Sequence, residues 1–179
     1  GDRAYNSSDG DNFVSWSWKA NGSGSSNSEG NTTATVSANT TSGFSILKWT
    51  QPGSADPTTL GHGLTTAPKM VIFKDLEATN AWYTGHDGMP SWGGYMVLNT
   101  TAAFTTNTDM FKNAAPTSTL ISTKYNQAGD SGNDVVAYAW TPIQGYSAMG
   151  SYTGNGNADG TFVYTGFKPA FFLQKKSSA

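Results

Sequence analysis

The sequence predicts an all-β protein, built as an antiparallel β-sandwich of the jelly-roll or concanavalin-like kind. Three observations lead to this fold class. Many short segments alternate large and small residues, the turns between them are rich in Gly, Asn, Asp and Pro, and parts of the sequence recur in the same order. Alternation with period two is typical of strands with one buried face. Many short strands separated by turns favour a sandwich.

The recurrences indicate partial tandem repeats that add strands at both ends. A run ending in Trp (Asp-Asn-Phe-Val-Ser-Trp-Ser-Trp) is echoed by Asn-Asp-Val-Val-Ala-Tyr-Ala-Trp, and two shorter echoes follow in the same order. The matching pairs are 11–18 with 133–140, 43–46 with 145–148, and 67–74 with 168–175. A spacing of roughly 100 to 120 residues marks a duplicated domain and not a short solenoid repeat.

This pattern divides the chain into four parts. Residues 1–20 are expected to be the terminal strand of a preceding repeat, and residues 21–42, rich in Gly, Ser, Asn and Thr, a flexible linker. Residues 43–144 are expected to form one complete β-sandwich repeat. Residues 145–179 are expected to begin a further repeat.

The individual strands are predicted from local pattern. The segment 70–74 is a short apolar run after Pro68, and proline is tolerated just before a strand. The best helix candidate, 101–111, contains several threonines, which disfavour a long helix. The predicted strands are 13–19, 44–50, 70–74, 95–98, 119–123, 135–140, 147–153, 161–164 and 170–174.

Composition excludes several classes of function. Only 12% of the 179 residues are charged and the formal net charge is −2, so no basic surface for nucleic acid or anionic lipid is expected. No run of apolar residues is long enough to insert into a membrane. The chain has no cysteine, which excludes disulfides and thiolate metal sites.

Catalysis finds little support, and the protein is predicted not to be an enzyme. There is no Gly-x-Ser-x-Gly nucleophile motif. Glycoside hydrolysis needs two carboxylates facing one bond, but the two glutamates, Glu29 and Glu77, lie far apart in sequence. Aspartates that converge in space would still permit a polysaccharide-cleaving enzyme, which stays the less favoured alternative.

Calcium is the one candidate cofactor. Asp9 and Asp11 lie in a turn before the first echo, and Asp130 and Asp134 lie in the equivalent turn before the second. Calcium takes six to eight oxygen ligands, which such loops can supply. Asp, Asn and Gly are also the ordinary residues of tight turns, so a purely structural role is the competing explanation.

Aromatic residues in polar turns are the candidate binding residues. Trp82, His86, Trp92 and Tyr95 lie in or beside Gly-rich turns. An exposed Trp or Tyr can stack on a sugar ring, which makes these four the candidate glycan contacts. Packing in the core is the alternative for the tryptophans.

The order of several motifs resembles a repeat module of large virion proteins of marine bacteriophages, often found beside laminin-G or concanavalin-like domains. The resemblance covers nearly the whole chain. The segments that carry it are 17–20, 43–46, 61–64, 67–70, 95–102, 115–118, 150–156 and 162–170. It implies a tail fibre or another appendage at the surface of an extracellular, lysis-released particle, and it transfers no catalytic residues.

Two functions follow as hypotheses. The first is a non-enzymatic structural and adhesive module that contacts host cell-surface polysaccharide, where many weak contacts add up by avidity. The second is a purely architectural subunit, for capsid decoration or a filament. In that case the partial repeats would leave a sheet edge open for other copies of the chain or other virion proteins, giving a homo-oligomer.

Overall fold

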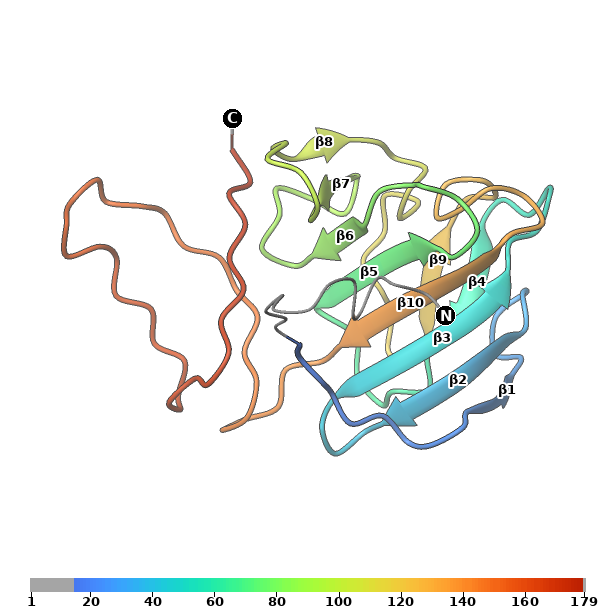
Figure 1. Cartoon of the computed structure of the whole chain (residues 1–179), viewed down its shortest axis with the longest axis horizontal. Helices are drawn as coiled ribbons and strands as arrows, with labels where there is room; N and C mark the ends of the chain where they lie inside the picture. Colours follow the sequence, from blue (N-terminus) through green and yellow to red (C-terminus); the bar gives the residue numbers. More distant parts are fainter. Residues whose placement is uncertain (1–14, 179) are drawn as a thin grey trace, which may run out of the picture.

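The computed structural model describes residues 15–178, which form an all-β, antiparallel sandwich and contain no α-helix (Figure 1). The predicted fold class is confirmed. Since this part of the chain has no helix, none of its segments is a candidate membrane-spanning helix. The strands are β1 (Ser25–Asn27), β2 (Ala34–Asn39), β3 (Phe44–Thr50), β4 (Thr58–Gly61), β5 (Met70–Asp75), β6 (Tyr83–His86), β7 (Gly94–Val97), β8 (Thr105–Thr106), β9 (Leu120–Thr123) and β10 (Asp134–Trp140).

Eight strands form one sheet in the order β1-β2-β3-β10-β5-β6-β7-β8, and β4 pairs with β9 in a second, smaller sheet. Figure 1 shows this pair behind the large sheet. The last strand, β10, lies in the middle of the large sheet. It pairs with β3 from Asp134↔Thr50 to Trp140↔Phe44 and with β5 on its other side.

The core lies between the two layers. Along β10, Val135, Ala137 and Ala139 are fully buried, and they alternate with residues on the outer face. Phe73 on β5 stacks on Phe111 with ring centroids 5.0 Å apart. Burying a side chain of this size contributes about 2–3 kcal/mol. Because inward and outward residues alternate, most of the stabilisation from buried apolar side chains comes from one face of the large sheet.

Residues 21–42 are not the linker that their composition suggested. They contain β1 and β2, and β2 pairs with β3 over Thr35↔Lys48 to Asn39↔Phe44. Ala34 and Val36 point into the core and are buried, while Thr35 is exposed. Small residues hide this alternation, because Ala and Ser carry little hydrophobic signal. The sandwich thus extends from 25 to 140.

The predicted strands at both ends are also absent from the described chain. Residues 15–20 form no strand, and neither do 147–153, 161–164 or 170–174. We call residues 145–178 the C-terminal arm. Apart from an isolated bridge between Ser147 and Ile143, the arm has no strand pairing in the described chain, and large side chains stay exposed, with Phe162 87% and Tyr164 83% accessible.

Figure 1 shows the C-terminal arm, in orange to red, leaving the sandwich after β10 and returning past the ends of the strands. Two contacts attach its final part. The Phe104 N–H donates to the Ser177 carbonyl at 3.0 Å, and Lys175 Nζ donates to the Thr100 carbonyl at 2.6 Å. The arm is therefore fixed near β8 but is not part of either sheet.

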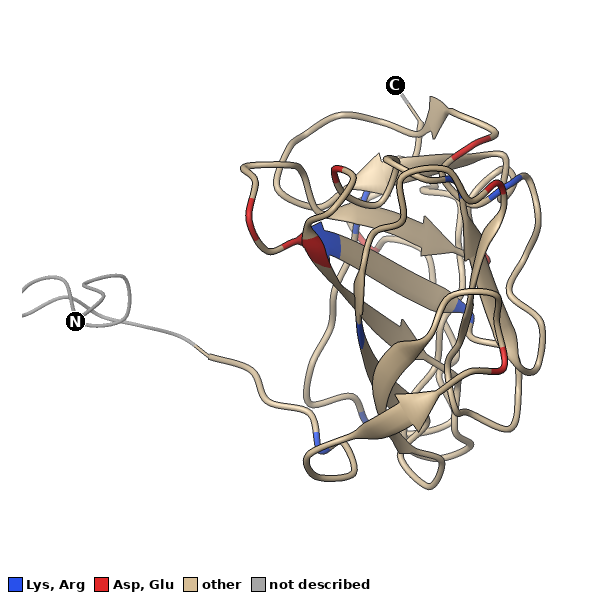
Figure 2. Cartoon of the chain, turned by 90° about the vertical axis from the view of Figure 1, so that its right-hand side faces the viewer, with Lys and Arg blue, Asp and Glu red and all other residues tan. Residues whose placement is uncertain are grey.

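Charged residues are few and of mixed sign, as Figure 2 shows on the side it presents. The densest group links three loops: Lys112 Nζ lies 2.7 Å from Asp56 and 3.2 Å from Asp109, and Lys124 lies 2.9 Å from Asp109. These pairs neutralise one another, so the group is not a patch of a single sign.

Candidate functional site

The predicted glycan residues do not form one platform. Trp92 is buried, with its ring 5.2 Å from that of Phe111. Tyr95 packs edge-on against Tyr83 at 5.0 Å, and both tyrosines lie against the core. For Trp92, the packing alternative describes the structure, and Tyr95, for which only glycan contact was predicted, is also packed against the core. The reason is that the Gly-rich turn around Trp92 brings the indole inward.

The other two predicted residues lie at opposite ends of one strand. His86, at the end of β6, is half-buried and its Nδ1 accepts the Gly88 N–H at 2.9 Å. Burial lowers the pKa of this imidazole, partly offset by the Asp87 carboxylate. Trp82 precedes β6 and is 38% exposed, and its backbone N–H donates to Asn99 Oδ1 at 3.1 Å. His86 is therefore a turn-stabilising group, and Trp82 is the one exposed aromatic of the four.

The two candidate calcium residues in the described part of the chain, Asp130 and Asp134, make separate structural contacts. Asp130 is exposed, and its backbone N–H donates to Asp75 Oδ2 at 2.9 Å. Asp134 lies 2.7 Å from Lys48 Nζ and accepts the Thr50 hydroxyl at 3.0 Å. The bond from Lys48, followed by that from Thr50, lowers the pKa of this carboxyl. Asp9 and Asp11 lie outside the described residues. Within 15–178, no three His, Asp or Glu side chains come together in a way that could hold a metal ion.

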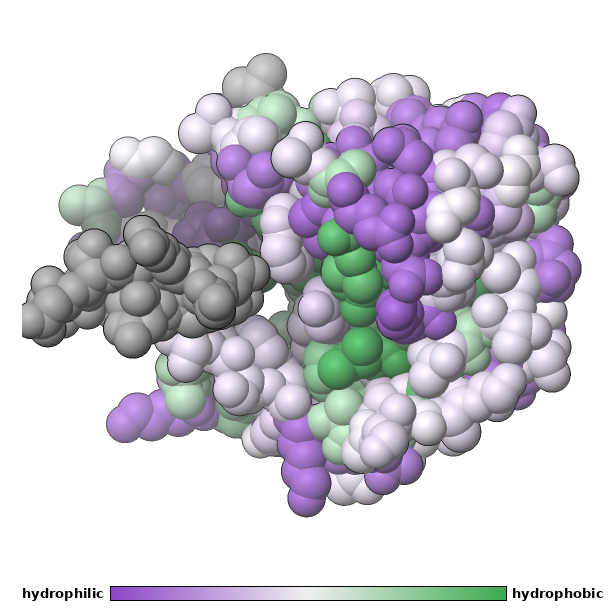
Figure 3. All heavy atoms as spheres, turned by 45° about the vertical axis from the view of Figure 1, so that its right-hand side comes forward, coloured by the Kyte–Doolittle hydropathy of each residue, from purple (hydrophilic) through white to green (hydrophobic). Residues whose placement is uncertain are grey.

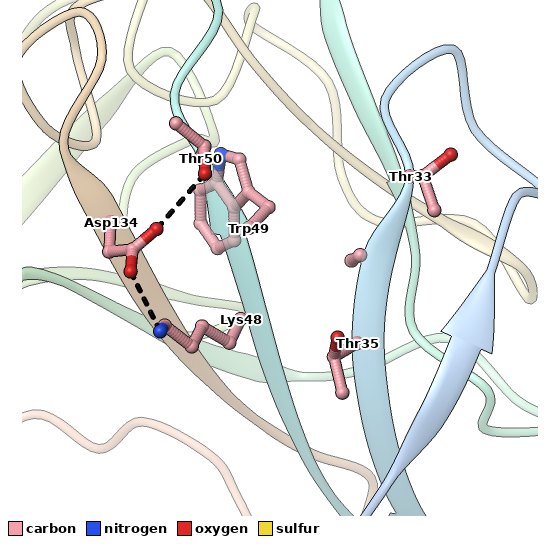
Figure 4. A pocket seen from close by; sticks show the side chains of 7 residues that line it. Thr33, Thr35, Lys48, Trp49, Thr50 and Asp134 are labelled. Carbon is pink, nitrogen blue, oxygen red and sulfur yellow. Dashed lines mark hydrogen bonds and ion pairs between the residues drawn. The ribbon is translucent and has the colours of Figure 1, made fainter.

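The hollow in Figure 4 brings the Asp134 pair together with two hydroxyl groups. Thr33 and Thr35 line it from the β2 side, opposite Lys48 and Thr50 on β3. The only charges shown there are those of Lys48 and Asp134, which bind each other. The hollow is therefore a shallow polar depression without a free nucleophile, acid or base.

One buried carboxylate was not singled out by the sequence. Asp75, the last residue of β5, is fully buried, and it accepts hydrogen bonds from five donor groups. Oδ1 accepts the N–H groups of Glu77 and Ala78 at 2.9 and 3.0 Å. Oδ2 accepts the Asp130 N–H at 2.9 Å and the Asn80 amide at 3.2 Å, and the Asn133 amide reaches both oxygens.

Burial alone would raise the pKa of the Asp75 carboxyl, because it disfavours the charged form. The hydrogen bonds from Asp130, Glu77, Asn133 and Ala78 outweigh burial and lower the pKa to about 2. No cation takes part in these contacts. Asp75 therefore ties the loop after β5 to the loop before β10, and it is a structural group.

A group of rings lies on the outer face of the large sheet, and we call it the aromatic cluster. Trp18 is its centre, with ring centroids 5.8 Å from Trp140, 6.3 Å from Phe44 and 5.5 Å from Phe171 of the arm. The other members are Trp16, which contacts Phe171 at 5.7 Å, and Tyr138, which stacks on Phe44 at 6.4 Å.

The aromatic cluster joins three parts of the chain: the start of the described residues, the centre of the large sheet and the arm. Trp16 is 61% exposed, Trp18 40% and Phe171 43%. From the side shown in Figure 3, strongly hydrophobic residues also gather in one narrow band on a mostly neutral or hydrophilic face. Exposed rings next to a sheet are typical of surfaces that bind another protein.

Sequence reasoning assigned Trp16, Trp18 and Trp140 to strands and did not connect them. The signal was present in the recurrence itself, since Trp18 and Trp140 occupy the same place in the two echoes. Two tryptophans at the same position of a repeated segment are expected to contact similar residues.

A sequence profile of one protein family matches residues 2–179, almost the full length. The chain belongs to this family, DUF7483. The DUF7483 family is described as a domain of unknown function. No curated protein and no solved structure matches the chain. Membership in DUF7483 therefore groups this chain with related sequences and leaves its activity to be argued from the aromatic cluster and the arm.

Proposed function

We propose that this DUF7483 domain is a non-enzymatic structural module of a bacteriophage particle, in a tail fibre or another appendage at the virion surface. The observation that carries the proposal is the C-terminal arm. It presents Phe162, Tyr164 and Phe172 to solvent with 87%, 83% and 70% of their surface accessible. Side chains of this size are rarely left exposed together unless another molecule covers them.

The sandwich supports this role as a scaffold. Eight strands share one sheet, and the Asp75 network fixes two loops at one end of it. A cysteine-free scaffold does not depend on oxidation to fold. The setting in a phage particle comes from the sequence resemblance described above. Together these features favour a durable subunit that binds its neighbours through apolar surface.

The role is tested by locating the domain in particles. An antibody raised against the purified chain is applied to intact virions of the encoding phage, and binding is imaged by electron microscopy with gold labelling. We expect regular labelling on an appendage or on the capsid surface. If neither labelling nor mass spectrometry detects the protein in purified particles, the proposal is refuted.

Glycan contact is a second candidate, favoured by the exposed indole of Trp82. Stacking of a sugar on an aromatic side chain needs an accessible ring face. A glycan array probed with the chain and with Trp82→Ala tests this, with the buried-residue variant Trp92→Phe as a control for folding. Equal binding of the chain and Trp82→Ala to every glycan would remove Trp82 as a contact.

A further inference from the structure

The sequence recurrences take on a spatial meaning when placed on the sheet. The echo of β10 is segment 11–18, and the echoes of β3 and β5 lie in the arm at 145–148 and 168–175. In the sandwich these strands are neighbours, in the order β3-β10-β5. The two ends of the chain therefore carry the counterparts of three adjacent strands, with the central one at the N-terminal end and its two partners in the arm.

The arm matches the β3–β5 region beyond these short echoes. Trp49-Thr50 recurs as Tyr152-Thr153, Gly53 as Gly156, Ala55-Asp56 as Ala158-Asp159, and Thr58 as Thr161. The order is unchanged and the spacing shifts by only a residue or two. The arm is thus a continuous counterpart of residues 43–74.

Contacts within the arm follow the sandwich as well. In the sandwich, the rings of Trp49 and Phe73 meet across the core at 5.9 Å. Their counterparts are Tyr152 and Gln174, and the Gln174 amide is hydrogen-bonded to the Tyr152 hydroxyl. The β3-like and β5-like segments therefore already touch at the equivalent position.

The N-terminal segment shows the same correspondence. In the sandwich, Trp140 of β10 lies opposite Met70 of β5. Their counterparts are Trp18 and Phe171, and these two rings are 5.5 Å apart. The ring contact thus has the register expected of a central strand beside its β5-like partner.

Among residues 15–178 the strand pairing suggested by these contacts is not completed. No backbone hydrogen bond joins residues 15–18 to the arm anywhere in the described chain. Trp16 stays 61% exposed and Phe172 70% exposed. Both halves of a strand-pairing surface are therefore open on the same molecule. A contact that a chain can make with itself can equally be made between two copies.

We propose that residues 15–18 of one copy insert as the central strand between residues 146–152 and 170–175 of a second copy. This is strand addition, in which backbone hydrogen bonds provide affinity and alternate side chains provide specificity. Because donor and acceptor surfaces differ, the contact is head-to-tail and joins many subunits into a closed ring or an open chain. The inference rests on the proposed architectural function and specifies how subunits would join.

The register gives a direct test. In the sandwich Ala139 lies opposite Ser45. The counterparts of these residues are Ser17 and Ser147. Directly opposed residues of antiparallel strands lie within the Cα separation that a disulfide needs. Since the chain has no cysteine of its own, Ser17→Cys and Ser147→Cys introduce the only thiols.

The two single variants are purified separately, mixed and oxidised, and the products are separated on a non-reducing gel. We expect a mixed dimer in about tenfold excess over the mixture of Ser17→Cys with Ser151→Cys, an off-register serine on the same segment, because only opposed residues are within disulfide reach. The double variant Ser17→Cys/Ser147→Cys should give a ladder of covalent multimers. Trp16→Ala in that background should reduce the ladder, since Trp16 contacts Phe171.

Two results would overturn the inference. A monomeric, internally cross-linked double variant would show that the segment pairs with its own arm and not with a second copy. Equal cross-linking of Ser147→Cys and Ser151→Cys would show that no register exists. Either result leaves the location of the domain in the virion untouched, because gold labelling measures that separately.

Discussion

Asp75 provides the sharpest test of how the sandwich is held together. Asp75→Asn keeps the shape of the side chain but replaces one acceptor oxygen by an amide that donates. Each oxygen of Asp75 accepts hydrogen bonds from three N–H groups. In either orientation of the Asn side chain, its NH₂ group would therefore face N–H donors in place of an acceptor oxygen. Leaving two or three buried donors without partners costs about 3–5 kcal/mol of unfolding free energy.

The pH dependence of unfolding gives a second estimate of how much Asp75 stabilises the fold. The folded pKa of Asp75 is lowered from 3.8 to about 2. A lowered folded pKa stabilises the protein at pH above the unfolded value and loses this contribution as the pH falls through the folded value. The shift corresponds to about 2 kcal/mol, allowing for some screening near the loops. Stability should therefore fall more between about pH 4 and pH 2 in the parent chain than in Asp75→Asn, which keeps only the smaller acid dependence of other carboxyls with lowered pKa values, such as Asp134.

Urea unfolding followed by Trp fluorescence measures both effects. The control is Asp134→Asn, which removes an exposed carboxylate paired with Lys48 and should change stability far less. An Asp75→Asn variant as stable as Asp134→Asn at neutral pH would refute the argument. So would an unchanged acid dependence in Asp75→Asn.

Three further predictions concern the core and its neighbours. His62 is fully buried, and its Nδ1 accepts the Leu64 N–H, so Nε2 donates to the Thr117 carbonyl. Burial lowers its pKa, only partly offset by the Thr117 bond, so stability should decline as the pH falls below about 6.5, where the unfolded chain binds a proton. Urea midpoints for His62→Gln should show a smaller slope, because only the contribution of His86 remains, and an identical slope would contradict the assignment. Gly85→Ala would place a methyl group against Trp92 and Phe111 and should destabilise the fold by about 1–3 kcal/mol. Gly150→Ala places its methyl group in open space and should leave stability unchanged. Thermal unfolding that finds Gly85→Ala as stable as the parent chain would contradict the packing. Trp92→Ala should lower unfolding free energy by about 3–5 kcal/mol and Trp82→Ala by less than about 0.5, and similar values for the two would be inconsistent with their burial.

The sequence was most informative where large residues alternate with small ones. That pattern predicted β3 and β10, where large residues occupy one face of each strand, on the inner face of β3 at Leu47 and Trp49 and on the outer face of β10 at Tyr138 and Trp140. A short apolar run predicted β5. The alternation pattern missed β2, whose inward residues include Ala34 and Val36 among serines and threonines. It also predicted strands in the arm, since local pattern specifies a strand but cannot supply the neighbour that completes it.

The site predictions depended on information that is not local. Trp82 and Trp92 both lie in polar, Gly-containing surroundings in the sequence, yet one is exposed and the other packs on Phe111. Asp134 is neutralised by Lys48, which is distant in sequence and adjacent in the sheet. Asp75 follows a predicted strand and belongs to no motif, and only the return of the chain at Asp130 and Asn133 reveals its role.

The central place of β10 has a consequence for synthesis on the ribosome. β3 and β5 are complete once residue 75 has emerged, but the strand that joins them ends at residue 140. Until then, the edges that will face β10 have no partner, and closing the sheet requires contacts between residues far apart in sequence. Such folding is slow and leaves strand edges exposed to aggregation. Segment 11–18 resembles β10 in sequence and is synthesised before it, so this segment can compete for the same gap while the chain is still growing.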